Sequence, residues 1–127
     1  MNTVDKLNAV IDYVEKHITE EIDLNHLAGI AYSSLYDFQR MFMFIAEISI
    51  AEYIRKRRLT LAGLDLRHNN AKVIDAALKY GYDSPVSFAR AFQAFHGVTR
   101  SQKAQCFVKS TPQINFSNNC ERGVAND

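Results

Sequence analysis

Two short stretches of the chain carry side chains suited to recognise the surface of another molecule. They are Tyr36, Gln39 and Arg40 in the first stretch, and Pro85, Val86, Ser87, Ala89 and Arg90 in the second. Arginine and glutamine can form paired hydrogen bonds with guanine and adenine, and apolar groups can contact the methyl group of thymine. These residue types therefore suit the reading of DNA bases. The sequence contains no nucleophile–base pair, carboxylate dyad or phosphate-binding loop, so we expect no enzyme.

Both stretches lie within a sequence that occurs twice, at an offset of fifty residues. The identical positions are Tyr32/Tyr82, Ser34/Ser84, Phe38/Phe88, Arg40/Arg90 and Phe42/Phe92. The phenylalanines recur at a spacing that places them on one face of a helix, so the polar candidates fall on the other side. The serine of each copy stands where its side chain can cap the first amide groups of the helix. The repeat therefore predicts two similar amphipathic helices.

A shorter helix precedes each amphipathic helix. Asp23 can cap the first of these short helices, and Gly81 can end the second because glycine readily adopts a left-handed conformation. A short helix, a turn and a capped helix together form the outline of a helix-turn-helix motif. The sequence thus predicts two such motifs.

Further helices complete the expected fold. One covers residues 4–17, and a long one covers residues 50–67. The apolar residues of the long helix include Tyr53, Ile54, Leu61 and Leu64. A second cap pattern, Thr99-Arg-Ser-Gln102, opens another helix after the second motif. We expect an all-α protein of about seven helices, in which two three-helix subdomains are joined by a linker helix.

The charge and composition limit the possible partners. The net charge is only +1, but residues 1–32 carry −4 and residues 33–107 carry +5, so one face can still attract phosphates. No stretch is long and apolar enough to span a membrane, and the N-terminus lacks a signal-peptide pattern, so we expect a cytoplasmic protein. The four histidines lie far apart and the two cysteines lack a zinc-type spacing. We therefore expect no metal and no cofactor.

The order of these residues resembles the DNA-binding domain of the AraC/XylS family of bacterial regulators. The resemblance covers roughly residues 4–107 and rests on Leu27-Ala28, Ser34, Phe38-Gln39-Arg40-Met41-Phe42, Glu52-Tyr53-Ile54, Arg58-Leu59, Ala62, Ala77, Gly81-Tyr82-Asp83-Ser84, Phe88, Arg90, Phe92 and Gly97-Val98-Thr99. It implies two helix-turn-helix subdomains, double-stranded DNA as the main partner and RNA polymerase as a second partner. It also implies that Tyr36, Gln39 and Arg40 contact bases.

Some positions depart from the pattern of the family. Glu47 stands where a glycine usually follows the first recognition helix, so a left-handed turn there would be strained. Met43 and Phe44 replace residues that are commonly charged. Arg40 also has an alternative to DNA, namely an ion pair with Asp37 or Glu47 on the protein surface.

The resemblance suggests limits for the subdomains. We expect a first helix-turn-helix subdomain at residues 1–48, a linker helix at 49–68, a second subdomain at 69–107 and a polar tail at 108–127. In relatives that carry a sensor after the DNA-binding domain, such a tail begins that sensor, so a partial regulator is an alternative. We expect no small-molecule ligand in this chain.

We expect each recognition helix to enter a major groove, with the first supplying most of the base reading. In the second, Val86 and Ala89 suit thymine methyl groups and Arg90 suits phosphate, although recognition of DNA shape explains this half equally well. Successive groove segments lie about 34 Å apart, whereas a helix over residues 50–67 spans about 27 Å. We therefore expect a monomer to cover two adjacent segments asymmetrically, with bent DNA or with only one half fully inserted.

A second class of function stays open. A helical protein-interaction module that has lost DNA binding would fit the near-neutral charge, and it would fit Met43 and Phe44 on an exposed face. Two further expectations concern packing. Arg58 should pair internally with an acidic neighbour, and Tyr32 and Tyr82 should pack in turns rather than contact bases.

Overall fold

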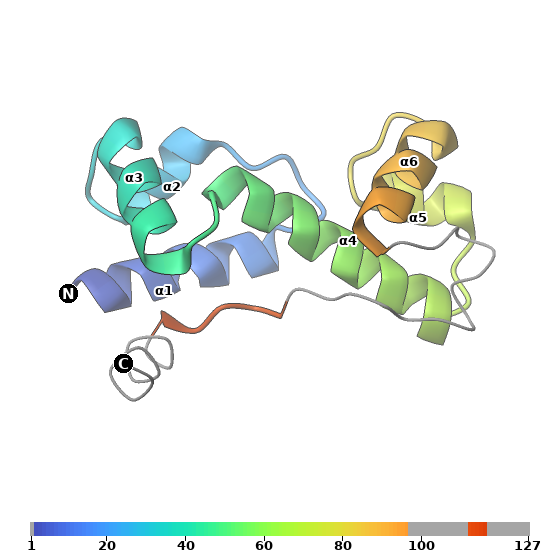
Figure 1. Cartoon of the computed structure of the whole chain (residues 1–127), viewed down its shortest axis with the longest axis horizontal. Helices are drawn as coiled ribbons and strands as arrows, with labels where there is room; N and C mark the ends of the chain where they lie inside the picture. Colours follow the sequence, from blue (N-terminus) through green and yellow to red (C-terminus); the bar gives the residue numbers. More distant parts are fainter. Residues whose placement is uncertain (1, 97–111, 117–127) are drawn as a thin grey trace. The chain divides into compact units, whose positions relative to one another are not determined.

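The computed structural model describes residues 2–96 and 112–116. Within these residues it contains helices and no strand, which confirms the expected all-α fold (Figure 1). The helices are α1 (Thr3–Lys16), α2 (Leu24–Ile30), α3 (Leu35–Ala46), α4 (Ile50–His68), α5 (Val73–Lys79) and α6 (Pro85–His96). The helix expected after Thr99 lies outside the described residues. No helix in the described ranges has both the length and the apolar character that a membrane crossing requires.

The chain folds as two units. Of the described residues, the first unit contains 2–17, 22–53 and 113–116, and the second contains 18–21, 54–96 and 112. The first unit therefore holds α1, α2 and α3, and the second holds α5 and α6. The helix α4 begins in the first unit and continues in the second.

The first unit is organised around the apolar stripe of α1. The side chain of Asn2 accepts a hydrogen bond from the amide of Asp5 at 2.9 Å, so α1 begins one residue earlier than expected. Helix α2 packs against both α1 and α3. The buried residues of this core are Leu7, Val10, Ile11, Val14, Leu27, Ala28, Ala31, Phe38, Phe42, Ile50 and Tyr53.

The C-terminal segment contributes to the same core. Phe116 is fully buried, and its ring packs edge-on against that of Phe42 with 5.5 Å between centroids. The backbone amide of Phe116 donates a hydrogen bond of 2.9 Å to the side-chain oxygen of Asn8. The sequence predicts a polar tail here, and the polar residues around Phe116 give no sign of a core position.

The second unit packs α5 and α6 against the later part of α4. Its buried residues include Leu59, Ala62, Leu66, Ala76, Ala77, Tyr80, Phe88, Phe92 and Phe95. Of the apolar residues named in the sequence of α4, Tyr53 and Ile54 are buried, whereas Leu61 and Leu64 are half-buried. The burial along α4 follows no single stripe because the helix contributes to two cores.

Polar contacts to α4 hold the second unit together. The guanidinium of Arg58 donates to the backbone carbonyls of Ile18 at 2.9 Å and Glu20 at 2.7 Å. The partners of Arg58 are thus carbonyl groups of a loop, not the acidic side chain that we expected. His96 is buried, and its ring N–H donates to the carbonyl of Leu59 at 3.0 Å. A buried polar group requires such a partner, because leaving it without one is costly.

Asp65 connects α4 to the short helix α5. One of its carboxylate oxygens accepts hydrogen bonds from the Lys79 ammonium at 2.8 Å and the Tyr80 hydroxyl at 2.7 Å. The other oxygen accepts a hydrogen bond of 3.1 Å from the side chain of Asn69. Burial raises the pKa of this carboxyl, but the hydrogen bonds and the positive charge of Lys79 outweigh burial, so the pKa lies below its usual value.

The docking of the C-terminal segment can be tested by shortening Phe116. The substitution Phe116→Ala should lower the free energy of unfolding by about 3 kcal/mol, because it leaves a cavity beside Phe42. The exposed Gln113 of the same segment provides the control, and Gln113→Ala should change stability by less than about 0.5 kcal/mol. Chemical denaturation measures both. Equal stability of the two variants would show that Phe116 does not occupy this core in solution.

The lowered pKa of Asp65 predicts that the stability of the fold depends on pH. Because the folded pKa is below the unfolded value of about 3.9, ionised Asp65 stabilises the fold above about pH 4, and this contribution is lost as pH falls through the folded pKa. The variant Asp65→Asn should therefore be less stable than wild type at pH 7, and the difference should shrink below pH 4. Denaturation curves across pH measure this effect. Asp75→Asn, at an exposed site on α5, is the control, and a pH-independent difference for Asp65→Asn would contradict the prediction.

Candidate nucleic-acid interface

Helix α3 presents its polar candidates to solvent because Phe38 and Phe42 are buried on the opposite face. The Ser34 hydroxyl accepts a hydrogen bond of 3.1 Å from the amide of Asp37, which fixes the start of the helix. Phe38 and Phe42 are fully buried one turn apart. On the other side of the helix, Tyr36, Gln39 and Arg40 are exposed, as the sequence predicts.

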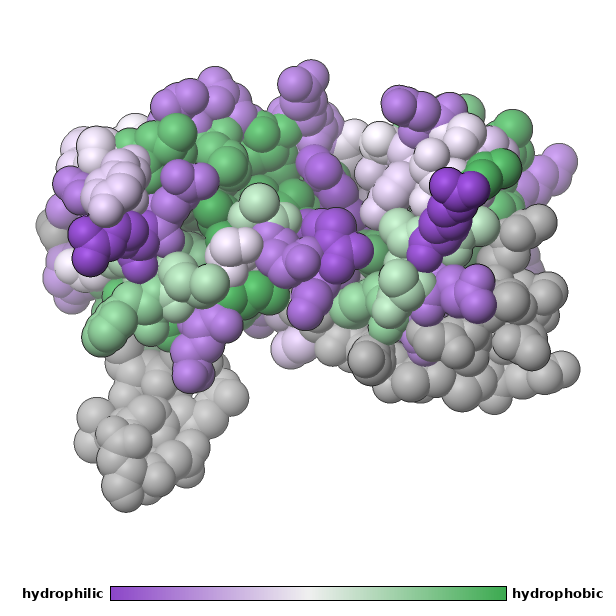
Figure 2. Space-filling model, turned by 45° about the horizontal axis from the view of Figure 1, so that its top comes forward, coloured by the Kyte–Doolittle hydropathy of each residue, from purple (hydrophilic) through white to green (hydrophobic). Residues whose placement is uncertain are grey.

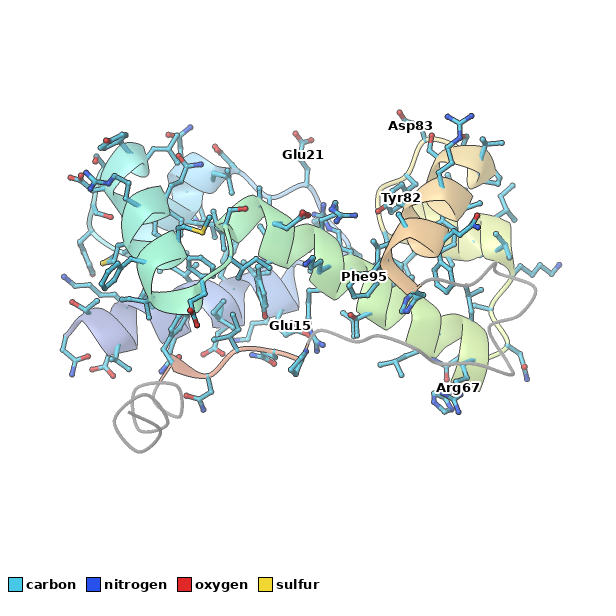
Figure 3. All side chains as sticks on the ribbon, in the orientation of Figure 1. Glu15, Glu21, Arg67, Tyr82, Asp83 and Phe95 are labelled. Carbon is cyan, nitrogen blue, oxygen red and sulfur yellow. The ribbon has the colours of Figure 1, made fainter. Side chains whose placement is uncertain are left out.

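Helix α6 repeats this arrangement in the second unit. The Ser84 hydroxyl accepts a hydrogen bond of 3.2 Å from the amide of Ser87, and Pro85 occupies the first helical position. Phe88, Phe92 and Phe95 are buried, and Phe95 points from α6 toward α4 (Figure 3). Of the predicted candidates, Pro85, Val86, Ser87 and Arg90 are exposed, whereas Ala89 is half-buried.

Each of the two helices carries a shallow hollow on its exposed face. The hollow on α3 has a volume of about 480 Å³ and is lined by Tyr36, Gln39, Arg40, Met43 and Phe44. The hollow on α6 has a volume of about 270 Å³ and is lined by Pro85, Val86, Ala89, Arg90 and Gln93. We call these surfaces the α3 hollow and the α6 hollow. They bring together most of the predicted site residues, and only Ser87 lines neither of them.

The two hollows use the same positions of the repeat. At the offset of fifty residues, the shared pairs are Tyr36/Val86, Gln39/Ala89, Arg40/Arg90 and Met43/Gln93. The first three pairs belong to the predicted site. The fourth pair does not, because Met43 was placed on the exposed face without a role and Gln93 was not considered. The signal was present in the sequence, since Gln93 lies three residues after Arg90 at the spacing that keeps residues on one helical face.

The polar groups of the α3 hollow interact with each other. The Arg40 guanidinium lies over the ring of Tyr36, 5.4 Å from its centroid. The alternative ion pair of Arg40 with Asp37 or Glu47 does not appear among the described contacts. Arg40 and its ring partner are both exposed and face the same hollow.

The ends of the motifs adopt left-handed backbone conformations. Glu47 follows α3 with a φ of 62°, which confirms the expected strained turn at a position without glycine. Gly81 has a φ of 86° and ends α5 as predicted. Tyr82 packs edge-on against Phe88 with 5.4 Å between centroids, as expected for a turn residue. Tyr32 differs from expectation because it is 76% exposed, with a φ of 55°.

The surface of each unit mixes hydrophilic and hydrophobic residues (Figure 2). The exposed apolar residues include Tyr36, Met43 and Phe44 on α3 and Val86 on α6. On such a surface, single arginines can form hydrogen bonds with base edges and apolar groups can contact thymine methyl groups. A uniformly basic surface would instead bind phosphates without regard to sequence.

Two histidines of the first unit pack against Tyr13. The ring of His17 stacks on that of Tyr13 with 3.9 Å between centroids, and the ring of His26 lies 4.7 Å from the same tyrosine. Across residues 2–96 and 112–116, no three histidine, cysteine or acidic side chains gather closely enough to hold a metal ion.

Comparison with known sequences identifies related proteins. A family model described as a helix-turn-helix domain matches residues 27–105. The chain is 35% identical over 95 residues to the HTH-type transcriptional activator AarP of Providencia stuartii, covering 75% of this chain and 70% of that protein. It is 32% identical over 87 residues to the regulatory protein SoxS of Salmonella typhimurium, covering 68% of this chain and 81% of that protein.

Solved structures share the fold. An AraC-type transcriptional regulator from Chromobacterium violaceum superposes with a TM-score of 0.72 at 22% identity, over 80% of this chain and 94% of that chain. The DNA-binding domain of AdpA, solved in complex with a target DNA, superposes with a TM-score of 0.69 at 20% identity, over 94% of this chain and 95% of that chain. The chain therefore shares its fold with these solved structures.

Proposed function

The chain belongs to the AraC/XylS family of helix-turn-helix transcription regulators, and on this premise we propose that it binds double-stranded DNA through α3 and α6. Each of these helices is the second helix of its motif, the one that docks in the major groove. The observation that carries the proposal is the pair of hollows built from equivalent positions of the two helices. One chain would occupy two adjacent segments of the groove, with one recognition helix in each.

The α3 hollow is the better equipped of the two to read bases. Arg40 offers a fork of N–H donors to guanine, and Gln39 offers a donor and an acceptor to adenine. Tyr36 lies beneath the Arg40 guanidinium, so the ring restricts the directions that the guanidinium can take. We infer that Tyr36, Gln39 and Arg40 supply most of the base contacts of the first unit.

The α6 hollow has fewer hydrogen-bonding groups. Pro85, Val86 and Ala89 present apolar surface that suits thymine methyl groups. Arg90 stands at the position equivalent to Arg40 and can reach a phosphate or a base. Ser87 is exposed at the start of the helix, where its hydroxyl also lies 3.2 Å from that of Ser84. We infer that this helix positions the protein on DNA and adds a smaller share of the base reading.

Family membership favours DNA over the alternative of a protein-interaction module. It also supports two finer proposals. The relative AarP is named a transcriptional activator, and activation requires action on RNA polymerase, so we propose polymerase as a second partner, to be tested by its effect on the mobility of the protein–DNA complex. We further infer a cytoplasmic location, where bacterial DNA lies, and a role without catalysis.

Binding across a salt series tests the proposal. The affinity for duplex DNA should fall as salt rises, with a slope of about −0.9 for each phosphate that the protein neutralises. Arg40→Ala should weaken binding by about 1–3 kcal/mol if Arg40 reads a base, and Arg90→Ala should lower the salt slope by about one if Arg90 binds a phosphate. Fluorescence anisotropy with labelled duplexes measures both effects.

Lys16→Ala provides the matched control, because it removes an exposed positive charge at the end of α1 that lines neither hollow. This variant should retain binding close to that of wild type. Absence of binding by the wild-type chain at low salt would contradict the proposed function and would favour the interaction module.

A further inference from the structure

We propose that the fourth position shared by the two hollows, Met43 in α3 and Gln93 in α6, is a base-reading position at which the two helices prefer different bases. In this proposal, Met43 contacts a thymine methyl group and Gln93 pairs with the edge of an adenine. The inference rests on the proposed DNA binding. The inference adds to the proposed DNA binding a pair of residues that determine which DNA sequence is bound.

The spacing of the four shared positions gives each hollow the reach to read several base pairs. In α3 they are residues 36, 39, 40 and 43, and in α6 they are residues 86, 89, 90 and 93. The first and last positions are seven residues apart, which is about 10.5 Å along a helix axis. Base pairs are stacked about 3.4 Å apart, so the last position can face a base pair about three steps from the one faced by the first.

Met43 presents apolar surface in the α3 hollow. Its side chain is 51% exposed, and it lies beside Phe44, which is 86% exposed. Removing apolar surface from water is favourable, and the apolar group in the major groove is the thymine methyl. Met43 is also flexible enough to fit a groove of irregular shape. The hollow therefore favours thymine at the base pair that faces its far end.

Gln93 adds a side-chain amide to the α6 hollow, whose other residues apart from Arg90 are apolar. Of the five residues that line this hollow, only Arg90 and Gln93 have side chains that can form hydrogen bonds. The carboxamide of glutamine matches the donor and acceptor pattern of adenine in the major groove. Gln93 is exposed one turn after Arg90, so both side chains can reach the same stretch of groove. Adenine is therefore the base that this hollow can recognise best at its far end.

The repetition of the hollows favours DNA as the ligand of this fourth position. Two equivalent hollows at an offset of fifty residues suit a ligand that presents the same groove at regular intervals. Neither hollow is lined by a carboxylate, and each contains one arginine, so both suit the strongly negative major groove.

An exchange of the two residues tests the proposal. Selection of bound duplexes from a randomised pool would be carried out with the full wild-type chain and with the variants Met43→Gln and Gln93→Met. Met43→Gln should change the preferred base at one base pair from thymine to adenine, and Gln93→Met should change one from adenine to thymine in the other half of the site. Ala94→Gln is the matched control, because it adds the same amide at an exposed α6 position outside the hollow, and it should leave the selected site unchanged.

Modified bases test the same contacts in the wild-type chain, without relying on a variant that has to fold. Deoxyuridine in place of the assigned thymine removes one methyl group and should weaken binding by about fourfold. 7-Deazaadenine in place of the assigned adenine removes an acceptor of the paired hydrogen bond and should weaken binding by at least about fivefold. Exchange variants that select the wild-type site, together with full affinity for both modified duplexes, would overturn the inference while leaving DNA binding intact. Failure of the wild-type chain to enrich any sequence or to bind DNA would instead overturn the proposed function.

Discussion

The burial of two phenylalanines one turn apart on each recognition helix determines which residues of that helix face solvent. Phe38 and Phe42 on α3, and Phe88 and Phe92 on α6, cannot turn outward without exposing large apolar surfaces. A helix is rigid about its own axis, so fixing one face also fixes the opposite face. The same four positions of the repeat therefore line the hollow of each unit, although three of the four pairs differ in residue type. The core thus sets the geometry of the interface, and the exposed side chains are free to set its specificity.

The surrounding contacts stabilise this arrangement in a different way in each unit. In the first, Phe116 packs on Phe42, so a segment distant in sequence supports the buried face of α3. In the second, Asp65 and the ring of His96 connect α4 to α5 and α6 through hydrogen bonds. Apolar packing tolerates small adjustments, whereas a hydrogen-bonded group requires a defined partner and direction. The two units therefore share a motif but do not share the contacts that hold it in place.

The sequence predicted what periodicity and capping determine locally. The repeated serines and phenylalanines indicated both recognition helices and their exposed faces, and the structure agrees for Tyr36, Gln39, Arg40 and Arg90. The errors concern contacts between distant residues. The packing of α4 in two cores decides which of its apolar residues are buried, and its own sequence does not show this. The carbonyl partners of Arg58 and the burial of Phe116 likewise depend on where loops return to the core, which no local pattern records. Gln93 differs in type from its repeat partner Met43, so the identical positions of the repeat do not point to it.

The low net charge of the chain affects how the exposed side chains of the two hollows can contribute to DNA binding. The net charge of the chain is +1 and each hollow contains one arginine, so the hollows themselves offer few positive charges to phosphates. In the proposed binding mode, contacts with base edges are the main contribution of the hollows. Such contacts stabilise the complex only on the matching sequence, because a mismatched base leaves polar groups without partners or apolar groups in water. In the proposed binding mode, the two hollows therefore contribute discrimination between sequences more than general affinity for DNA.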